Sequence, residues 1–179
     1  MTSKNGCHVV RGVSLLLILF LGSPGLASAA GSQTSTVIVT ASIPPSCTIG
    51  TAAIAFAAYD AVNANATRPD DQTGDILIRC TTGASGITID LGNGANNAGT
   101  QRRMANSAVT TRFINYEVYK DPGRASIWGV GDGGSVRSGA DLNGSGLAVA
   151  VTMYGRIPPG QLGAIAGTYN DTLVSAINF

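Results

Sequence analysis

The strongest constraint on the fold is a solitary strand pattern in residues 34–43, which Pro44 and Pro45 close off. Val37, Val39, Ala41 and Ile43 share one face of an extended strand, and Ile38 is the only large apolar side chain on the other face. No turn signal folds this segment back into a hairpin, and the two prolines separate it from the residues that follow. Such a strand has to pair with another sheet edge, either in its own domain or in a second molecule.

Residues 1–29 predict a secretion signal. Lys4 and Arg11 precede an apolar run at 13–21, and small residues follow a Pro-Gly break, so we expect cleavage after Ala29. The apolar run is too short to span a bilayer. The remaining chain of about 150 residues is long enough for a single domain with its own core, and we expect it to be exported in soluble form.

The charge of the chain argues against polyanionic partners. Lys and Arg number 11 against 10 Asp and Glu, and two of the basic residues lie in the expected signal. The densest basic spot is the Arg102-Arg103 pair, which is far smaller than the basic stripe that nucleic acids or anionic membranes require. We therefore expect no nucleic-acid partner and no insertion into a membrane.

Cysteine and histidine usage argues against metal and redox chemistry. Cys47 and Cys80 are the cysteines outside the signal, and such a pair in a small exported domain favours a structural disulfide. A redox or metal thiol pair would need closely spaced cysteines or a nearby histidine. The single histidine, His8, lies in the expected signal. Histidine-based catalysis and the usual zinc and copper sites are thereby excluded, and we expect no metal and no cofactor.

Two further patterns suggest chemistry or binding. Asp70 and Asp71 could belong to a carboxylate hydrolase, but neighbouring strand residues point to opposite sides, and the sequence Arg-Pro-Asp-Asp predicts a polar loop. Four aromatic residues could form a sugar-binding platform, although core packing is the more common role of such rings; they are Tyr116, Tyr119, Trp128 and Tyr154. We therefore expect no enzyme activity, and a monomeric secreted carbohydrate-binding module remains an alternative.

The composition favours strands and turns over helices. The chain has 24 glycines, many Asn, Thr and Ser residues and a single Glu. Short alternating segments follow one another at the spacing of an all-β sandwich. The expected strands are 46–49, 54–59, 75–80, 86–91, 111–119, 126–128, 146–154 and 168–179. Residues 129–134 match a dinucleotide-binding fingerprint, but no helix follows them, so we expect a turn there.

The order of several short motifs resembles one protein family. The motifs are Cys47-Thr-Ile, Phe56-Ala-Ala-Tyr59-Asp60, Gly74-Asp-Ile-Leu-Ile-Arg-Cys80, Leu91-Gly-Asn-Gly94, Arg102-Arg-Met104, Ile114-Asn-Tyr116-Glu-Val-Tyr119, Ile127-Trp128-Gly129, Met153-Tyr154-Gly155-Arg-Ile-Pro158-Pro-Gly160-Gln161, Ala166-Gly167-Thr-Tyr169-Asn-Asp171 and a terminal Phe179. In this order, over almost the whole chain after the signal, they resemble the spore coat protein U domain family. That family includes pilins of archaic (Csu-type) chaperone–usher pili.

The resemblance implies an incomplete immunoglobulin-like β-sandwich that is completed by donor-strand exchange, with residues 30–45 as the donor segment and 46–179 as the pilin domain. The side chains that would enter the groove of a neighbouring subunit are Val37, Val39, Ala41 and Ile43. The last strand would border the groove of this chain through Leu173, Ile177 and Phe179, and we expect Leu173 and Ile177 to face the core. By the same resemblance, the disulfide would tie the first strand of the domain to its neighbour.

The resemblance also implies partners and a destination. A periplasmic chaperone lends the missing strand, and an outer-membrane usher exchanges it for the strand of the next subunit, of the same or another kind. Head-to-tail linkage that does not close produces a filament. We therefore expect a shaft or adaptor subunit of a cell-surface pilus that supports adhesion and biofilm formation. A coat or matrix protein of the same family remains an open alternative.

Overall fold

The computed structural model describes residues 31–131 and 135–179. The expected secretion signal with its cleavage site, and part of the expected turn at 129–134, lie outside the described residues. Contacts divide the chain into two units, Met1–Thr40 and Ala41–Phe179, and the second unit contains both sheets. No helix in the described part is long and apolar enough to cross a membrane.

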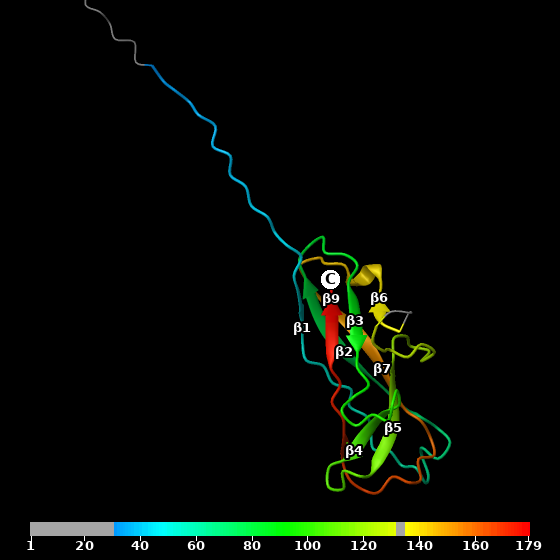
Figure 1. Cartoon of the computed structure of the whole chain (residues 1–179). Coiled ribbons are helices and arrows are strands. Elements are labelled where there is room, and N and C mark those ends of the chain that lie inside the picture. Colours follow the sequence, from blue (N-terminus) through cyan, green and yellow to red (C-terminus); the bar gives the residue numbers. More distant parts are fainter. Residues whose placement is uncertain (1–30, 132–134) are drawn as a thin grey trace, which may run out of the picture. The chain divides into compact units, whose positions relative to one another are not determined.

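Two antiparallel sheets make up the second unit (Figure 1). The larger sheet contains, in spatial order, β1 (Cys47–Ile49), β2 (Asp70–Cys80), β7 (Ala148–Ile157), β5 (Phe113–Tyr119), β4 (Arg102–Asn106) and β8 (Tyr169–Asn170). The smaller sheet contains β6 (Arg137–Ser138), β3 (Thr88–Leu91) and β9 (Ser175–Asn178). A short 3-10 helix, η1 (Ala140–Leu142), follows β6. The prediction of an all-β fold is confirmed.

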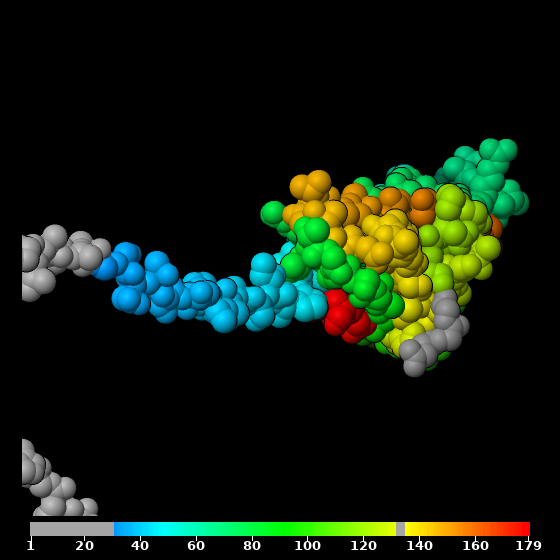
Figure 2. Space-filling model, turned by 90° about the horizontal axis from the view of Figure 1, so that it is seen from above, coloured from blue at the N-terminus to red at the C-terminus, as the bar shows by residue number. Residues whose placement is uncertain are grey.

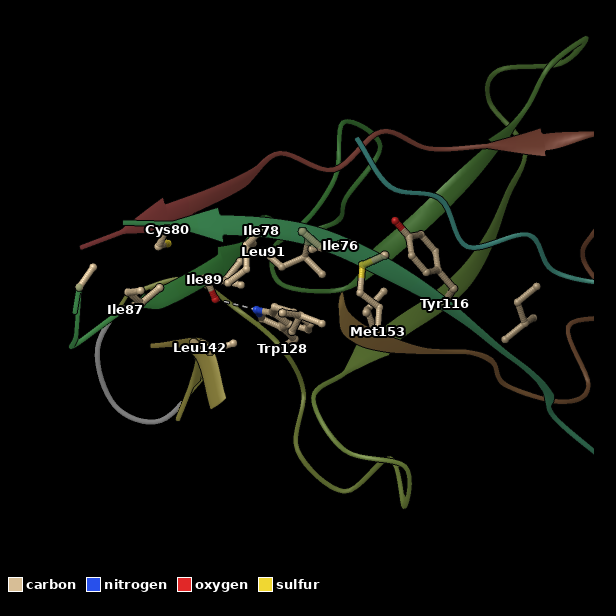
Figure 3. Packing of buried hydrophobic residues seen from close by; sticks show 14 of the residues in the cluster. Ile76, Ile78, Cys80, Ile87, Ile89, Leu91, Tyr116, Trp128, Leu142 and Met153 are labelled. Atoms are coloured by element: carbon tan, nitrogen blue, oxygen red, sulfur yellow. Dashed lines mark hydrogen bonds between the residues drawn. The ribbon is translucent and has the colours of Figure 1, made fainter. Parts of the chain in front are cut away.

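The core lies between the two sheets and is centred on Trp128 (Figure 3). Ile76, Ile78 and Met153 reach it from the larger sheet, and Ile87, Ile89 and Leu91 reach it from β3 and the residue before it. Trp128 is fully buried, and its indole N–H donates a hydrogen bond to the carbonyl oxygen of Ile89 at 2.7 Å. A buried indole needs such a partner, so this bond fixes the position of β3 relative to the ring.

The longest pairing joins β2 to β7, from Asp70 opposite Ile157 to Arg79 opposite Ala148. The prediction that Asp70 and Asp71 lie in a loop is therefore wrong, because both residues begin β2. Asp71 faces outward, where Arg156 on the neighbouring strand contacts its carboxylate at 2.7 Å. The hydrogen bond from Arg156 holds the pKa of Asp71 below its ordinary value and makes a charged residue compatible with a strand.

The remaining expected strands agree with the structure to different degrees. Residues 54–59 form no strand, and residues 126–128 contribute only an isolated bridge between Ile127 and Tyr119. The single strand expected at 168–179 is interrupted: β8 pairs with β4 in the larger sheet, and β9 pairs with β3 in the smaller one. Strand β4 is missing from the expectation because its sequence, Arg-Arg-Met-Ala-Asn, has no apolar alternation.

The N-terminal segment forms no strand between residues 31 and 46 in the single chain. In the alternating pattern at 34–43, the exposed fractions of Val37, Val39 and Ile43 are 82%, 88% and 83%. Within the described part of the chain, this strand pattern thus has no pairing partner.

Candidate functional site

An apolar groove opens between residues 49–56 and residues 171–175. It encloses a cavity of about 570 Å³. Side chains from both sheets form its floor: Ile76, Leu91, Met104, Tyr116, Val118 and Met153. A second cavity of about 520 Å³ lies between residues 54–59 and 164–170. The two cavities share Ile54, Phe56 and Met104, so both lie along the segment 49–59.

The first wall of the groove, residues 51–59, continues the chain beyond β1. The backbone N–H of Gly50 donates to the carbonyl oxygen of Leu77 at 2.8 Å, and the next backbone bond along the chain is that of Asp60 to the Asn65 side chain. Between these positions, no backbone N–H or C=O of residues 51–59 has a hydrogen-bond partner in the described part of the chain. The wall is therefore an extended segment with an unpaired edge.

Close packing against two glycines holds this wall on the larger sheet. A Cβ atom on Gly155 of β7 would lie 2.8 Å from Cζ of Phe56 and 2.9 Å from Cγ2 of Ile54. A Cβ atom on Gly74 of β2 would lie 2.0 Å from the carbonyl oxygen of Ala53. Only glycine leaves room for the backbone and side chains of the wall at these positions.

The second wall is formed by residues 171–175 and continues into β9. The N–H groups of Gly92 and Ala95 donate to the carbonyl oxygens of Val174 and Thr172 at 2.9 and 3.0 Å. Because neighbouring residues of an antiparallel strand direct their backbone groups to opposite sides, those of Leu173 and Ser175 face away from β3. Strand β9 lies close to β1, and no ladder hydrogen bonds join the two among the described residues (Figure 1).

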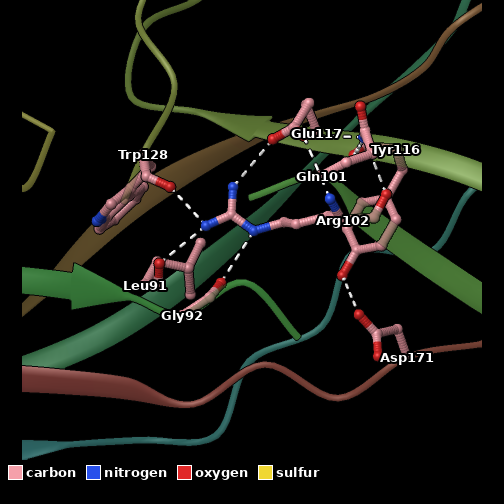
Figure 4. Close-up of polar contacts among 8 residues, drawn as sticks. All are labelled: Leu91, Gly92, Gln101, Arg102, Tyr116, Glu117, Trp128 and Asp171. Atoms are coloured by element: carbon pink, nitrogen blue, oxygen red, sulfur yellow. Dashed lines mark hydrogen bonds and ion pairs between the residues drawn. The ribbon is translucent and has the colours of Figure 1, made fainter. Parts of the chain in front are cut away.

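One polar pair interrupts the apolar surface of the groove (Figure 4). The hydroxyl of Tyr116 donates to Oδ2 of Asp171 at 2.7 Å, and Oδ1 of Asp171 accepts bonds from the backbone N–H and the side-chain amide of Asn96. Burial, together with the hydrogen bond and charge of Asp171, raises the pKa of Tyr116 well above its ordinary value. Both groups are already partnered, so the groove offers an apolar surface and two backbone edges rather than a reactive centre. No group of His, Cys, Asp and Glu in the described residues could hold a metal ion.

The residues singled out from the sequence lie as follows. Cys47 and Cys80 are bonded to each other and face each other across β1 and β2, so the predicted disulfide is confirmed. Leu173 lines the groove, and Ile177 packs against the core and pairs with Ile89. Phe179 follows β9 at the surface, where Figure 2 shows the C-terminal residues in red, and its exposed fraction is 56%.

The aromatic residues considered for sugar binding do not form one platform. Trp128 and Tyr116 are buried in the core. Tyr119 and Tyr154 are half-buried and lie opposite each other on β5 and β7.

Sequence reasoning missed most of the groove itself. Its floor comes from strands that are far apart in the chain, and no local pattern reports their convergence. A signal was available in the first wall, where Phe56 and Tyr59 are large aromatic residues in an alanine-rich segment. We expected an ordinary strand there.

Comparison with known proteins identifies the family. Residues 33–176 match the Spore Coat Protein U domain. The chain belongs to this family. Protein U of Myxococcus xanthus is 33% identical over 161 residues, which cover 84% of this chain and 87% of that protein.

The fold is also similar to that of a solved chaperone–usher complex. The structure is the CsuC–CsuE chaperone–tip adhesion subunit pre-assembly complex from archaic chaperone-usher Csu pili of Acinetobacter baumannii, with a TM-score of 0.51 and 22% identity. The match covers 76% of this chain and 40% of that chain. This match shows a likeness of fold to a chain of that complex.

Proposed function

We propose that the chain is a structural subunit of a chaperone–usher pilus, in which residues 34–43 of one copy fill the groove of the next. The observation that supports this function is a groove with an unpaired backbone edge on each side and an apolar floor. An added strand could hydrogen-bond to both walls at the usual strand spacing of about 4.8 Å. The chain supplies a matching strand, because residues 34–43 have one apolar face and pair with no other segment that the structure describes.

Burial of the strand would stabilise the assembly considerably. Val37, Val39 and Ile43 have exposed fractions above 80% in the single chain. Full burial of such side chains contributes about 1.5–3 kcal/mol each, and each backbone hydrogen bond adds about 1 kcal/mol net. Because the strand and the groove are different surfaces of one molecule, the linkage is head-to-tail and extends into a filament.

The same geometry accounts for the proposed partners. A subunit with an empty groove exposes apolar surface and unpaired edges, which promote aggregation. A periplasmic chaperone would cover the groove after the secretion signal is removed, and an outer-membrane usher would exchange the chaperone strand for that of the next subunit. The end product would be a shaft or adaptor subunit of a cell-surface pilus with a role in adhesion and biofilm formation. This is a structural function without enzyme activity.

The assembly is tested by charge substitutions on the two faces of the strand. Val39→Asp places a carboxylate on the apolar face, whereas Thr40→Asp places the same charge on the opposite face and serves as the matched control. We expect multimer ladders on unheated gels for the unchanged chain and for Thr40→Asp, and their loss for Val39→Asp and for deletion of residues 31–43. Ladders that persist in the deleted chain would show that this segment is not the donor.

A second destination is supported by the 33% identity to Protein U of Myxococcus xanthus over most of both chains. A coat or matrix protein of the same family could polymerise through the same groove. Immunogold labelling of intact cells separates the two: thin surface fibres are expected for a pilus subunit, and a continuous layer for a coat or matrix component.

A further inference from the structure

We propose that Tyr59 is a positioning residue that fastens the far end of the first groove wall and thereby sets how tightly the groove holds an incoming strand. The inference rests on the proposed function of the groove. It starts from residues 51–59, whose backbone forms no hydrogen bond within the described part of the chain, so that the wall depends on side-chain packing and on its two ends.

The near end of the wall is covalently fixed. Cys47 is bonded to Cys80, and the β1–β2 pairing continues to the bond between Gly50 and Leu77. Just beyond the far end, Asp60 is bonded to Asn65, whose carbonyl oxygen accepts the backbone N–H of Gly160 at 2.9 Å. Within the wall itself, Tyr59 makes the hydrogen bonds to this turn. The hydroxyl of Tyr59 donates to the carbonyl oxygen of Pro158 at 2.7 Å and accepts the backbone N–H of Gln161 at 3.2 Å.

The turn to which Tyr59 binds is itself attached to β5. The backbone N–H of Asn115 donates to Oε1 of Gln161 at 2.6 Å, and Nε2 of Gln161 donates to the carbonyl oxygen of Asn115 at 2.9 Å. The amide thus makes the two bonds that a neighbouring strand would make, just beyond the end of β7 at Ile157. Gln161 fixes the turn to the sheet, and Tyr59 fixes the wall to the turn.

Between these ends, the wall is held by side-chain packing, chiefly that of Ile54 and Phe56 near Gly155. Without the Tyr59 hydroxyl, the hydrogen bonds of Asp60 and Asn65 alone would connect the far end to the turn, so the end of the wall would move more freely and the width of the groove would vary. An incoming strand would then have to order the wall as it binds, which weakens binding. The intact contact keeps the groove preorganised.

The test measures binding of a synthetic peptide with the sequence of residues 34–43 to the full chain. The Val39→Asp variant is the background, because its own segment competes poorly for the groove. Tyr59→Phe removes only the hydroxyl, and Tyr154→Phe is the matched control, since no hydrogen bond of its hydroxyl occurs among the described residues. We expect Tyr59→Phe to accelerate peptide dissociation about tenfold, because two hydrogen bonds are lost, and Tyr154→Phe to leave the rate unchanged.

A second readout is independent of the peptide. In the free protein, amide hydrogen exchange of Gln161 should be faster in Tyr59→Phe than in the control, because its acceptor is gone. Should Tyr59→Phe fail to fold, Gln161→Ala tests the same connection and is expected to accelerate dissociation as well.

The outcomes separate the two proposals. A peptide that does not bind the background variant at all overturns the proposed function together with the role of Tyr59. A peptide that binds the background and Tyr59→Phe equally well overturns only the role of Tyr59, and so does unchanged exchange of the Gln161 amide.

Discussion

Replacement of Arg102 by methionine is expected to destabilise the fold more than any surface substitution. The guanidinium is almost fully buried, with an exposed fraction of 1%, and it links the two sheets (Figure 4). Its Nη2 donates to the carbonyl oxygens of Leu91 at 2.8 Å and Trp128 at 2.6 Å. Its Nε donates to the carbonyl oxygen of Gly92 at 2.9 Å, and its Nη1 contacts the carboxylate of Glu117 at 3.1 Å.

The magnitude follows from what the substitution leaves behind. Methionine fills much of the same space but donates nothing, so buried carbonyl oxygens and the carboxylate of Glu117 lose a charged partner. Hydrogen bonds to charged groups contribute about 1.5–3 kcal/mol each, and loss of one partner of a buried ion pair costs about 3–5 kcal/mol. These contributions are not additive, so we expect the free energy of unfolding to fall by about 4 kcal/mol, out of about 5–15 kcal/mol for a typical domain. A second substitution, Glu117→Leu, should restore part of the loss.

Urea unfolding provides the assay, with fluorescence of Trp128, the single tryptophan of the chain, and far-UV circular dichroism as two probes. Arg103→Met is the control on the opposite face of β4. That guanidinium donates to the carbonyl oxygen of Asn96 and lies 4.1 Å from the ring centre of Phe113, where a loss of about 1 kcal/mol is expected. Equal losses for the two variants would refute the reasoning that Arg102 acts as a buried link.

Three further predictions address single contacts. In urea unfolding, Cys47→Ser should lower the free energy of unfolding by about 3–4 kcal/mol relative to the unchanged chain, because the bond closes a loop over a separation of 33 residues, and Cys80→Ser, which removes the same bond, should lower it equally. Burial raises the pKa of Glu117 above its ordinary 4.5 despite the attraction of Arg102. The folded protein therefore binds a proton more readily than the unfolded chain, and the free energy of unfolding should rise as the pH falls through the raised pKa towards 4.5. Urea titrations at several pH values, with Glu117→Gln as the reference, measure this rise. Gly94→Ala should lower the melting temperature, because φ is +91° there and a Cβ atom would lie 1.9 Å from Oδ2 of Asp171.

Alternation of apolar and polar residues identified the strands that have one buried and one exposed face. Strands β5 and β7 were predicted to within a few residues because buried and exposed residues alternate along them, and β2 was predicted only from residue 75 onward. The same rule failed at 168–179. There the half-buried residues Tyr169, Asp171 and Leu173 keep one face inward, while the hydrogen-bond partner changes from β4 to β3. Periodicity reports which face is buried and contains no information on which strand is the neighbour.

The groove could not be predicted from local patterns for a related reason. Residues 54–59 were expected to form a strand, yet among the described residues they have no neighbour on the open side and form no ladder. The sequence signal for a strand depends on propensity and burial, whereas a strand in the structure also requires a partner. Only the resemblance to a family implied that the partner comes from another molecule.

Under the proposed function, the N-terminal strand could enter the groove of its own chain or that of a neighbouring copy, and Pro44 and Pro45 affect this choice. The strand ends at Ile43, and β1 begins at Cys47, so only a short link joins the strand to the wall of its own groove. A tight hairpin at this link would favour residues with positive φ, and proline holds φ near −65° and lacks an N–H. The two prolines therefore disfavour folding of the strand back beside β1. Under the proposed function, a strand whose two prolines disfavour entry into its own groove would be captured by a neighbouring copy in preference to closure within one chain.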